Sequence, residues 1–81
     1  MNIANDLLRN LDKLHTTERG VARIKKNLNI DTELAVKYCY NKILEENTII
    51  NRKGKNWYAT TNNCIISVNA YTFTIITAHS L

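Results

Sequence analysis

Apolar residues in the first half of the chain recur at spacings of three and four, which is the period of an α-helix with one buried face. This pattern predicts a first helix over residues 3–14 and a second one from the N-cap candidates Thr16 and Thr17 to about Asn27. A third helix is predicted over residues 31–46, with Asp31 as its N-cap. Its apolar positions fall on one side and comprise Val36, Cys39, Tyr40, Ile43 and Leu44.

After Asn47 the apolar period changes to two, and β-branched and aromatic residues replace the helix formers. Strands are predicted over residues 48–51, 55–60, 64–68 and 72–78. A two-residue turn at Ala70-Tyr71 would set three cross-strand pairs: Val68 with Phe73, Ile66 with Ile75, and Cys64 with Thr77. One sheet face is then largely apolar and the other largely polar, which is typical of a sheet covered by helices on one side. The predicted fold is α+β, with two to three N-terminal helices packed on one face of a C-terminal four-stranded antiparallel meander.

The length of 81 residues favours a single domain over residues 1–81, because smaller pieces would bury too little apolar surface. No apolar run is long enough to span a bilayer, and charged residues interrupt the first eleven positions. We therefore expect a cytoplasmic protein.

The two cysteines, Cys39 and Cys64, fit reduced core thiols, and their spacing to His15 and His79 matches no zinc motif. Neither a metal nor a cofactor is expected.

Charge is distributed unevenly along the chain, whose formal net charge is +4. Residues 1–47 carry basic and acidic residues in similar numbers, whereas residues 48–81 contain Arg52, Lys53 and Lys55 but no Asp or Glu. An uncompensated positive field of this kind favours anionic partners such as phosphates.

The first candidate site lies at the junction of the first two helices, in His15-Thr16-Thr17-Glu18-Arg19-Gly20. A helix N-terminus attracts anions, so Thr16 with Arg19 or Arg23 could hold a phosphate. The alternative is a capped helix with solvated basic residues.

The second candidate is the basic turn 52–55 followed by Trp57 and Tyr58. Cations beside aromatic rings suit a ligand with a phosphate and a nucleobase, and Lys53 and Lys55 would supply the charge. Alternatively, the lysines keep the sheet soluble and Trp57 belongs to the core. The sequence does not favour either interpretation.

The third candidate is the last strand, where Thr77 and His79 share a face under the period of two. A histidine near the C-terminus is more often only an exposed polar end, but its pKa permits proton transfer near neutral pH. If His15 and His79 met, one could deprotonate a 2′-hydroxyl of RNA and the other protonate the leaving oxygen. This pairing is a hypothesis that the sequence alone does not test.

Four segments carry a resemblance to a known family: LHTTERG, RIKKNL, GKNWY and IISVNAYTFTIITAH. They resemble a small bacterial and phage-associated domain family of unknown function, over nearly the whole chain from Leu14. The resemblance implies a compact domain and singles out these positions without giving them roles: His15, Thr16, Gly54, Lys55, Trp57, Tyr58, Asn69, Thr77 and His79. A looser likeness, at the level of the fold, is to the barnase, colicin and RelE group of small ribonucleases.

Three functions follow from these patterns, and they leave open whether the chain is an enzyme. The leading one is binding of a phosphate-bearing ligand, RNA or a nucleotide. The second is a metal-independent, toxin-like ribonuclease. The third is a small phage-type inhibitor that binds a host-defence protein or sequesters a signalling nucleotide; the sequestering form would favour a homo-oligomer, for which Ile65 and Ile76 on the polar sheet face are contact candidates.

Overall fold

The computed structural model describes residues 3–30 and 34–81. Within these residues, three α-helices and a short 3-10 helix precede four β-strands, which confirms the predicted α+β fold. The elements are α1 (Ile3–Arg9), η1 (Leu11–Lys13), α2 (Glu18–Leu28), α3 (Ala35–Ile43), β1 (Ile49–Lys53), β2 (Asn56–Thr60), β3 (Cys64–Asn69) and β4 (Ile75–Ser80). Among these residues, none of the helices is long and apolar enough to cross a membrane.

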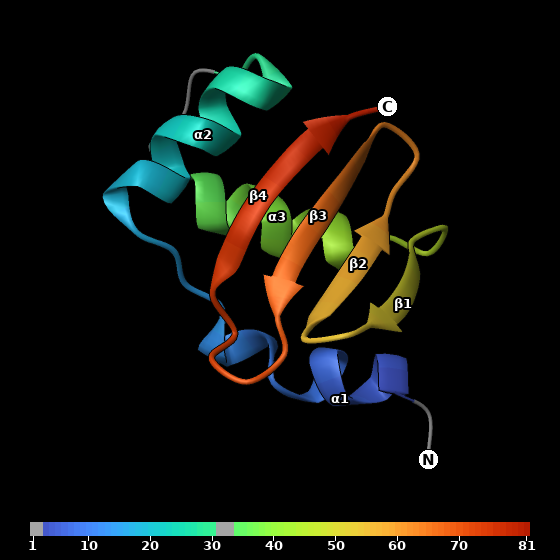
Figure 1. Cartoon of the computed structure of the whole chain (residues 1–81). Helices are drawn as coiled ribbons and strands as arrows, with labels where there is room; N and C mark the ends of the chain where they lie inside the picture. Colours follow the sequence, from blue (N-terminus) through green and yellow to red (C-terminus); the bar gives the residue numbers. More distant parts are fainter. Residues whose placement is uncertain (1–2, 31–33) are drawn as a thin grey trace.

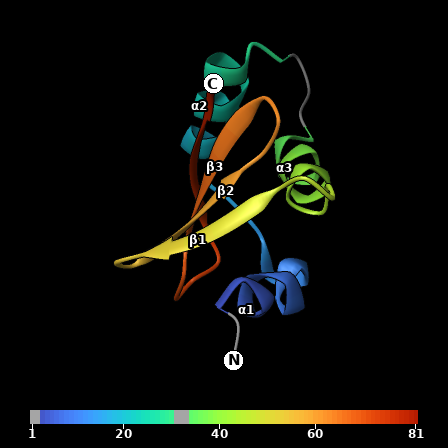
Figure 2. The same cartoon turned by 90° about the vertical axis from the view of Figure 1, so that its right-hand side faces the viewer.

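The sheet is an antiparallel meander with strand order β1-β2-β3-β4 (Figure 1). Helix α3 lies behind it, α2 runs beside β4, and α1 with η1 lies at the end where the β1–β2 and β3–β4 connections meet (Figures 1 and 2). The face toward α3 carries the buried strand residues except Ser67, and none of the described helices lies over the middle of the opposite face. This second surface is called the open face below.

The core is one apolar cluster between the sheet and the helices. Alternate strand positions point into it because successive side chains of a strand lie on opposite faces. Leu7, Leu11 and Leu14 enter it from the N-terminal region, and Ile24 enters from α2. The strands contribute Trp57, Ala59, Cys64, Ile66, Val68, Ile75 and Ala78.

The predicted register of the last hairpin is wrong. Val68 pairs with Ile75, Ile66 with Ala78 and Cys64 with Ser80, and a bulge interrupts the ladder between Ser67 and Val68. The loop is longer than two residues because the side chain of Asn69 binds two backbone amides within it. The longer loop and the bulge together move Thr77 from the predicted apolar face to the open face, where it pairs with Ser67.

The predicted first helix is interrupted at Asn10. Its side-chain Nδ2 donates to the carbonyl of Asp6, 2.7 Å away, and its backbone N–H bonds to Leu7 instead. The side chain thus takes the acceptor that a continuing helix would use, so α1 ends at Arg9 and a 3-10 turn follows.

The third helix is shorter than predicted and buries a narrower stripe. Its buried positions are Ala35, Cys39 and Ile43, spaced by four residues. Tyr40 and Leu44 were expected on the same face, but they are 37% and 52% exposed. They lie one residue beyond buried positions, which is about 100° around the helix axis. The expected N-cap of this helix, residue 31, lies outside the described residues.

Candidate phosphate-binding surface

The turn between β1 and β2 presents three cations to solvent. Gly54 has a φ of +60°, a left-handed conformation that glycine adopts without strain, and Arg52 Nε donates to its carbonyl at 2.9 Å. Arg52, Lys53 and Lys55 are all exposed. The tight turn therefore concentrates positive charge in a small region, which we call the turn cluster.

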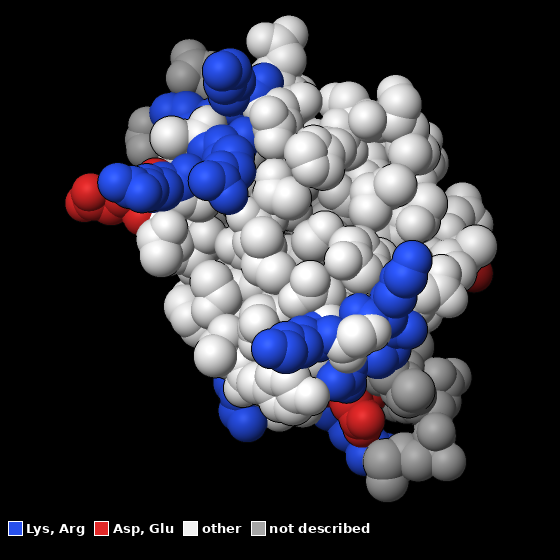
Figure 3. Space-filling model, viewed as in Figure 1, with Lys and Arg blue, Asp and Glu red and all other residues white. Residues whose placement is uncertain are grey.

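Helix α2 presents a second group of cations. It begins after Thr17, whose hydroxyl accepts the N–H of Gly20 at 3.1 Å, as predicted for an N-cap. Arg19, Arg23 and Lys26 on this helix are exposed and form the helix cluster. Figure 3 shows the two clusters on the same side of the molecule, over α2 and over the β1–β2 turn, with an uncharged surface between them.

The surface between the clusters is the open face of the sheet. Its central row runs across all four strands as Asn51, Tyr58, Ser67 and Thr77. Ser67 is buried, so the surface of the row presents the amide of Asn51 and the hydroxyls of Tyr58 and Thr77. Asn27 of α2 reaches this row, because its Nδ2 donates to Thr77 Oγ1 at 3.2 Å. No acidic residue lies in the sheet region 48–81. The face therefore offers hydrogen-bonding groups without repelling an anion.

A shallow hollow of about 480 Å³ lies on the open face beside the turn cluster. Lys53, Tyr58, Thr60 and Ile65 line it. The hydroxyl of Tyr58 accepts a hydrogen bond from Asn56 Nδ2 at 3.3 Å, which fixes the half-buried ring against the sheet. Tyr58 is thus the aromatic residue of the predicted site that faces this surface.

Trp57 belongs to the core. Its side chain is only 2% exposed and its ring lies 5.4 Å from that of Phe73, centroid to centroid. The indole Nε1 is buried and has no hydrogen-bond partner within the described part of the chain. The sequence favoured neither a core position nor a ligand-stacking position for Trp57. The structure shows the core position, and Trp57 offers no open face to a ligand.

The two histidines do not meet. His15 forms a bridge with Thr74, immediately before β4, whereas His79 pairs with Ile65 near the other end of that strand. Thr74 and His79 are five positions apart in extended chain, a distance of about 16 Å at the usual rise per residue. The structure therefore does not assemble the pair that a two-histidine cleavage mechanism needs.

His15 has a structural environment. Nδ1 lies 2.9 Å from the carbonyl of Lys13, and Nε2 lies 3.0 Å from Thr74 Oγ1. Because a carbonyl only accepts, Nδ1 donates the first hydrogen bond, and Nε2 shares the second with the threonine hydroxyl, which can donate or accept. Both ring nitrogens are thereby used to join the segment before α2 to β4.

Two further predicted ligand residues form internal hydrogen bonds. The hydroxyl of Thr16 donates to the carbonyl of Ile75 at 2.9 Å. The side-chain oxygen of Asn69 accepts the N–H groups of Tyr71 and Thr72 at 2.9 and 3.0 Å. Both residues hold the connections around β4 in place.

Sequence reasoning missed two residues of this region. The sequence pattern assigns Asn27 only to the end of a helix and Tyr71 only to a turn, although Tyr71 is 69% exposed in the structure. An aromatic ring in a short loop beside a basic turn is a signal that could have identified Tyr71. Nothing in the sequence indicates that Asn27 reaches Thr77, because that contact depends on the packing of α2 against β4.

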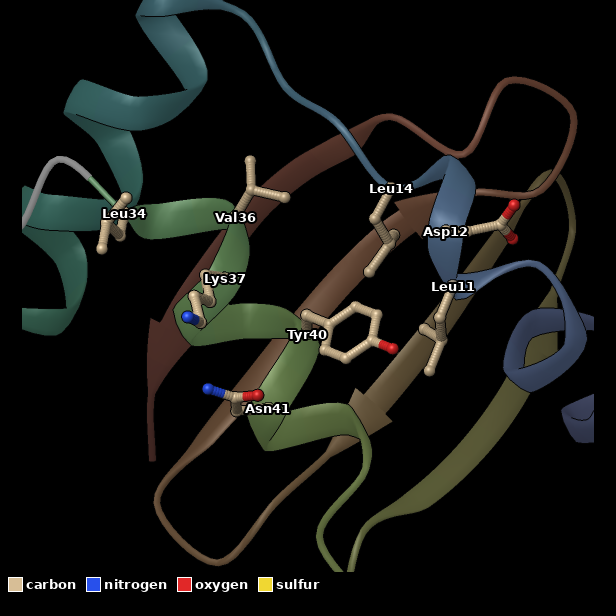
Figure 4. Close-up of a pocket in the computed structure, with 8 residues that line it drawn as sticks. All are labelled: Leu11, Asp12, Leu14, Leu34, Val36, Lys37, Tyr40 and Asn41. Atoms are coloured by element: carbon tan, nitrogen blue, oxygen red, sulfur yellow. The ribbon is translucent and has the colours of Figure 1, made fainter.

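A second hollow lies on the helical side, between η1 and α3 (Figure 4). It measures about 490 Å³, and most of its wall is apolar. Asp12 and Lys37 stand on opposite walls, one from η1 and the other from α3. The full lining comprises Leu11, Asp12, Leu14, Leu34, Val36, Lys37, Tyr40 and Asn41.

Comparison with known proteins settles the family. Residues 8–79 match the model of a family described as a protein of unknown function, DUF3781. The chain belongs to this family. The predicted resemblance to a domain of unknown function is thereby confirmed, and DUF3781 brings no activity with it. No curated protein and no solved structure matches the chain, so the looser likeness to barnase, colicin and RelE ribonucleases stays unconfirmed for this DUF3781 domain.

Proposed function

We propose that this chain binds a phosphate-bearing ligand, RNA or a nucleotide, on the open face of its sheet. The observation that carries the proposal is the placement of two basic clusters on either side of an uncharged, hydrogen-bonding surface (Figure 3). Lysine and arginine side chains at the margins would contact phosphates, and the amides and hydroxyls between them would contact sugars or bases. Tyr58, Lys53 and Lys55 from the predicted site belong to this surface, as does Arg23.

The distance between the clusters favours RNA over a single nucleotide. Adjacent strands lie about 4.8 Å apart, so β1 and β4 are separated by about 14 Å, and α2 adds about 10 Å. The phosphates of one nucleotide are adjacent to each other and would reach only one cluster. A strand of several nucleotides would reach both.

The test is a binding titration with a fluorescently labelled single-stranded RNA of about 12 nucleotides, a length within the site sizes of small binding domains. The buffer contains EDTA, and the RNA is analysed for cleavage on the same samples. We expect binding without cleavage, and weaker binding by Lys53→Gln/Lys55→Gln and by Arg23→Gln. Lys42→Gln removes one positive charge from α3, behind the sheet, where Lys42 pairs with Glu45, and it is the control matched in charge to Arg23→Gln.

The outcomes separate the predicted functions. RNA that stays unbound by the wild type at low salt would refute the proposal. Cleavage that His79→Ala abolishes would favour the ribonuclease, and a nucleotide that raises the melting temperature while RNA does not would favour a nucleotide-sequestering protein. Equal binding by the double lysine variant and by Lys42→Gln would move the site away from the turn cluster.

A second function, protein binding, is favoured by the hollow between η1 and α3, and we infer that its occupant is a second copy of the chain. A two-fold axis over this hollow would place Asp12 of each copy against Lys37 of the other. Neither residue has an ion-pair partner within the described part of the chain. Leu34 is 62% exposed at the same rim and would be covered by such a contact. This contact would replace the predicted one through Ile65 and Ile76, which lie half-buried in the sheet.

Sedimentation equilibrium tests the self-association. We expect a dimer for the wild type, a monomer for Asp12→Lys, and a dimer again when Lys37→Asp is added, because the double reversal restores the opposite charges. A wild type that stays monomeric at high concentration would exclude this contact. A dimer that the single charge reversal leaves intact would place the interface elsewhere.

A further inference from the structure

The loop between β3 and β4 is held by its own hydrogen bonds. The side-chain oxygen of Asn69 accepts the N–H groups of Tyr71 and Thr72, while its backbone N–H donates to the carbonyl of Thr74 at 2.8 Å. The hydroxyls of Thr72 and Thr74 lie 2.8 Å apart. A loop with this many internal bonds has one preferred conformation, so the position of Tyr71 is set before any ligand arrives.

The same loop is attached to the turn cluster and to the core. Ala70 N–H donates to the carbonyl of Lys55 at 2.8 Å, which ties the two connections together. Phe73 turns inward onto Trp57, and Lys13 Nζ lies 5.5 Å from the centroid of its ring. Phe73 has a φ of +60°, a backbone conformation that costs a non-glycine residue free energy. The backbone is therefore strained at Phe73, in a conformation that packs its ring against the core.

Tyr71 has the opposite environment, because 69% of its surface is exposed. The guanidinium carbon of Arg52 lies 5.5 Å from the centroid of its ring and 5.7 Å from that of Trp57. Arg52 thus connects Tyr71 to a buried aromatic ring while its Nε bonds to Gly54. These contacts fix the ring of Tyr71 beside the exposed guanidinium of Arg52, and the bond from Ala70 to Lys55 holds its loop against the turn cluster.

We propose that Tyr71 is a stacking platform for one unpaired base of single-stranded RNA. This inference rests on the proposed RNA binding and adds the form of RNA that the site takes. An exposed ring offers a π-face to a base, and the neighbouring cations offer contacts to the flanking phosphates. A base inside a duplex has both faces covered by its neighbours, so a single strand or a frayed end is required.

The platform also explains why Asn69 and Trp57 stand beside the predicted site without facing a ligand. Asn69 fixes the loop that carries Tyr71, and Trp57 packs against Phe73 and Arg52. They are positioning residues for Tyr71. Asn69→Ala should therefore weaken binding of single-stranded RNA while leaving the charge of the surface unchanged.

The experiment compares wild type, Tyr71→Ala and Tyr71→Phe with three probes: a single-stranded RNA of about 12 nucleotides, a blunt RNA duplex of the same length, and inorganic polyphosphate. We expect Tyr71→Ala to bind the single strand about 5- to 150-fold more weakly, the range reported for loss of one stacked base. Tyr71→Phe keeps the ring and should bind within about twofold of the wild type on that scale. Duplex and polyphosphate binding should not change in either variant.

Failure of this inference differs from failure of the proposed function. If the wild type binds RNA and Tyr71→Ala binds the single strand equally well, the platform is refuted and the phosphate-binding surface stands. If Tyr71→Ala weakens polyphosphate as much as RNA, Tyr71 acts by orienting Arg52, and stacking is refuted. If the wild type binds no RNA, both proposals fail. Because Tyr71 is exposed, a melting curve close to that of the wild type confirms that each variant is folded.

Discussion

Gly20 of α2 packs directly against Thr16 in the segment before the helix, and its replacement gives a sharp test of that packing. A Cβ placed on Gly20 would overlap Thr16 Oγ1 and would lie 3.1 Å from Thr16 Cβ. The same hydroxyl donates to the carbonyl of Ile75, which joins the start of α2 to β4. Gly20→Ala must therefore displace Thr16 and break this hydrogen bond.

The change in the free energy of unfolding is the balance between a gain in helix propensity and two losses in packing and hydrogen bonding. Alanine is favoured over glycine inside a helix by about 1 kcal/mol. Loss of the Thr16 to Ile75 hydrogen bond costs about 1 kcal/mol, and forcing packed atoms apart costs about 1–3 kcal/mol. We expect Gly20→Ala to lower the free energy of unfolding by about 1–3 kcal/mol, and the melting temperature by about 10 °C for a domain of this size.

Urea denaturation of Gly20→Ala, Thr16→Ala and the double variant measures the coupling. Without the hydroxyl at position 16, the added methyl group has room after a small adjustment. Gly20→Ala should then be neutral, or stabilising by about 1 kcal/mol, in the Thr16→Ala background. The reasoning would be refuted if Gly20→Ala stabilised the wild type, or if it cost the same free energy in both backgrounds.

Other sites give further predictions. Gly54→Ala should destabilise by about 1–2 kcal/mol, although open space surrounds it, because its φ is +60°; thermal unfolding should show a smaller loss for Gly54→Asn. Asn29 closes α2 with a φ of 53°, so Asn29→Ala should destabilise by about 1 kcal/mol while Asn29→Gly keeps or raises the melting temperature. Burial and the nearby Cys64 raise the pKa of Cys39 from 9.0 to about 12. Between pH 9 and 10 the Cys39 thiol therefore stays protonated in the folded state but loses its proton in the unfolded state. The free energy of unfolding should fall by about 1 kcal/mol over this range. Denaturation of Cys39→Ala over the same range should lack that component, and an equal pH dependence in both proteins would contradict the assignment.

The order and type of the elements could be predicted from the sequence because the apolar period changes once, after Asn47. The last hairpin could not, because its register depends on one side chain. Asn69 binds two amides of the loop, and a bulge then shifts β4 so that Thr77 faces outward. A turn of two residues satisfies the apolar pattern equally well, so the periodicity does not distinguish it from the longer loop.

The residues of the candidate site also differ in how far the sequence predicts their positions. Exposed cations on a turn, such as Lys53 and Lys55, are predictable because nothing in a small domain can bury them. The orientation of Trp57 is not, since a ring beside a basic turn suits a core and a ligand site equally. The separation of His15 from His79 follows from strand pairing across the whole sheet, which no local pattern encodes.

The salt dependence of RNA binding tests the central claim most directly. If four cations of the two clusters contact phosphates of a single strand, the logarithm of the association constant should fall with the logarithm of salt concentration with a slope of about −3. Lys53→Gln/Lys55→Gln should make the slope shallower by about 1.4, and Lys42→Gln should leave it unchanged. A slope near zero for the wild type, or an equal change in the Lys42→Gln control, would contradict phosphate binding at the open face.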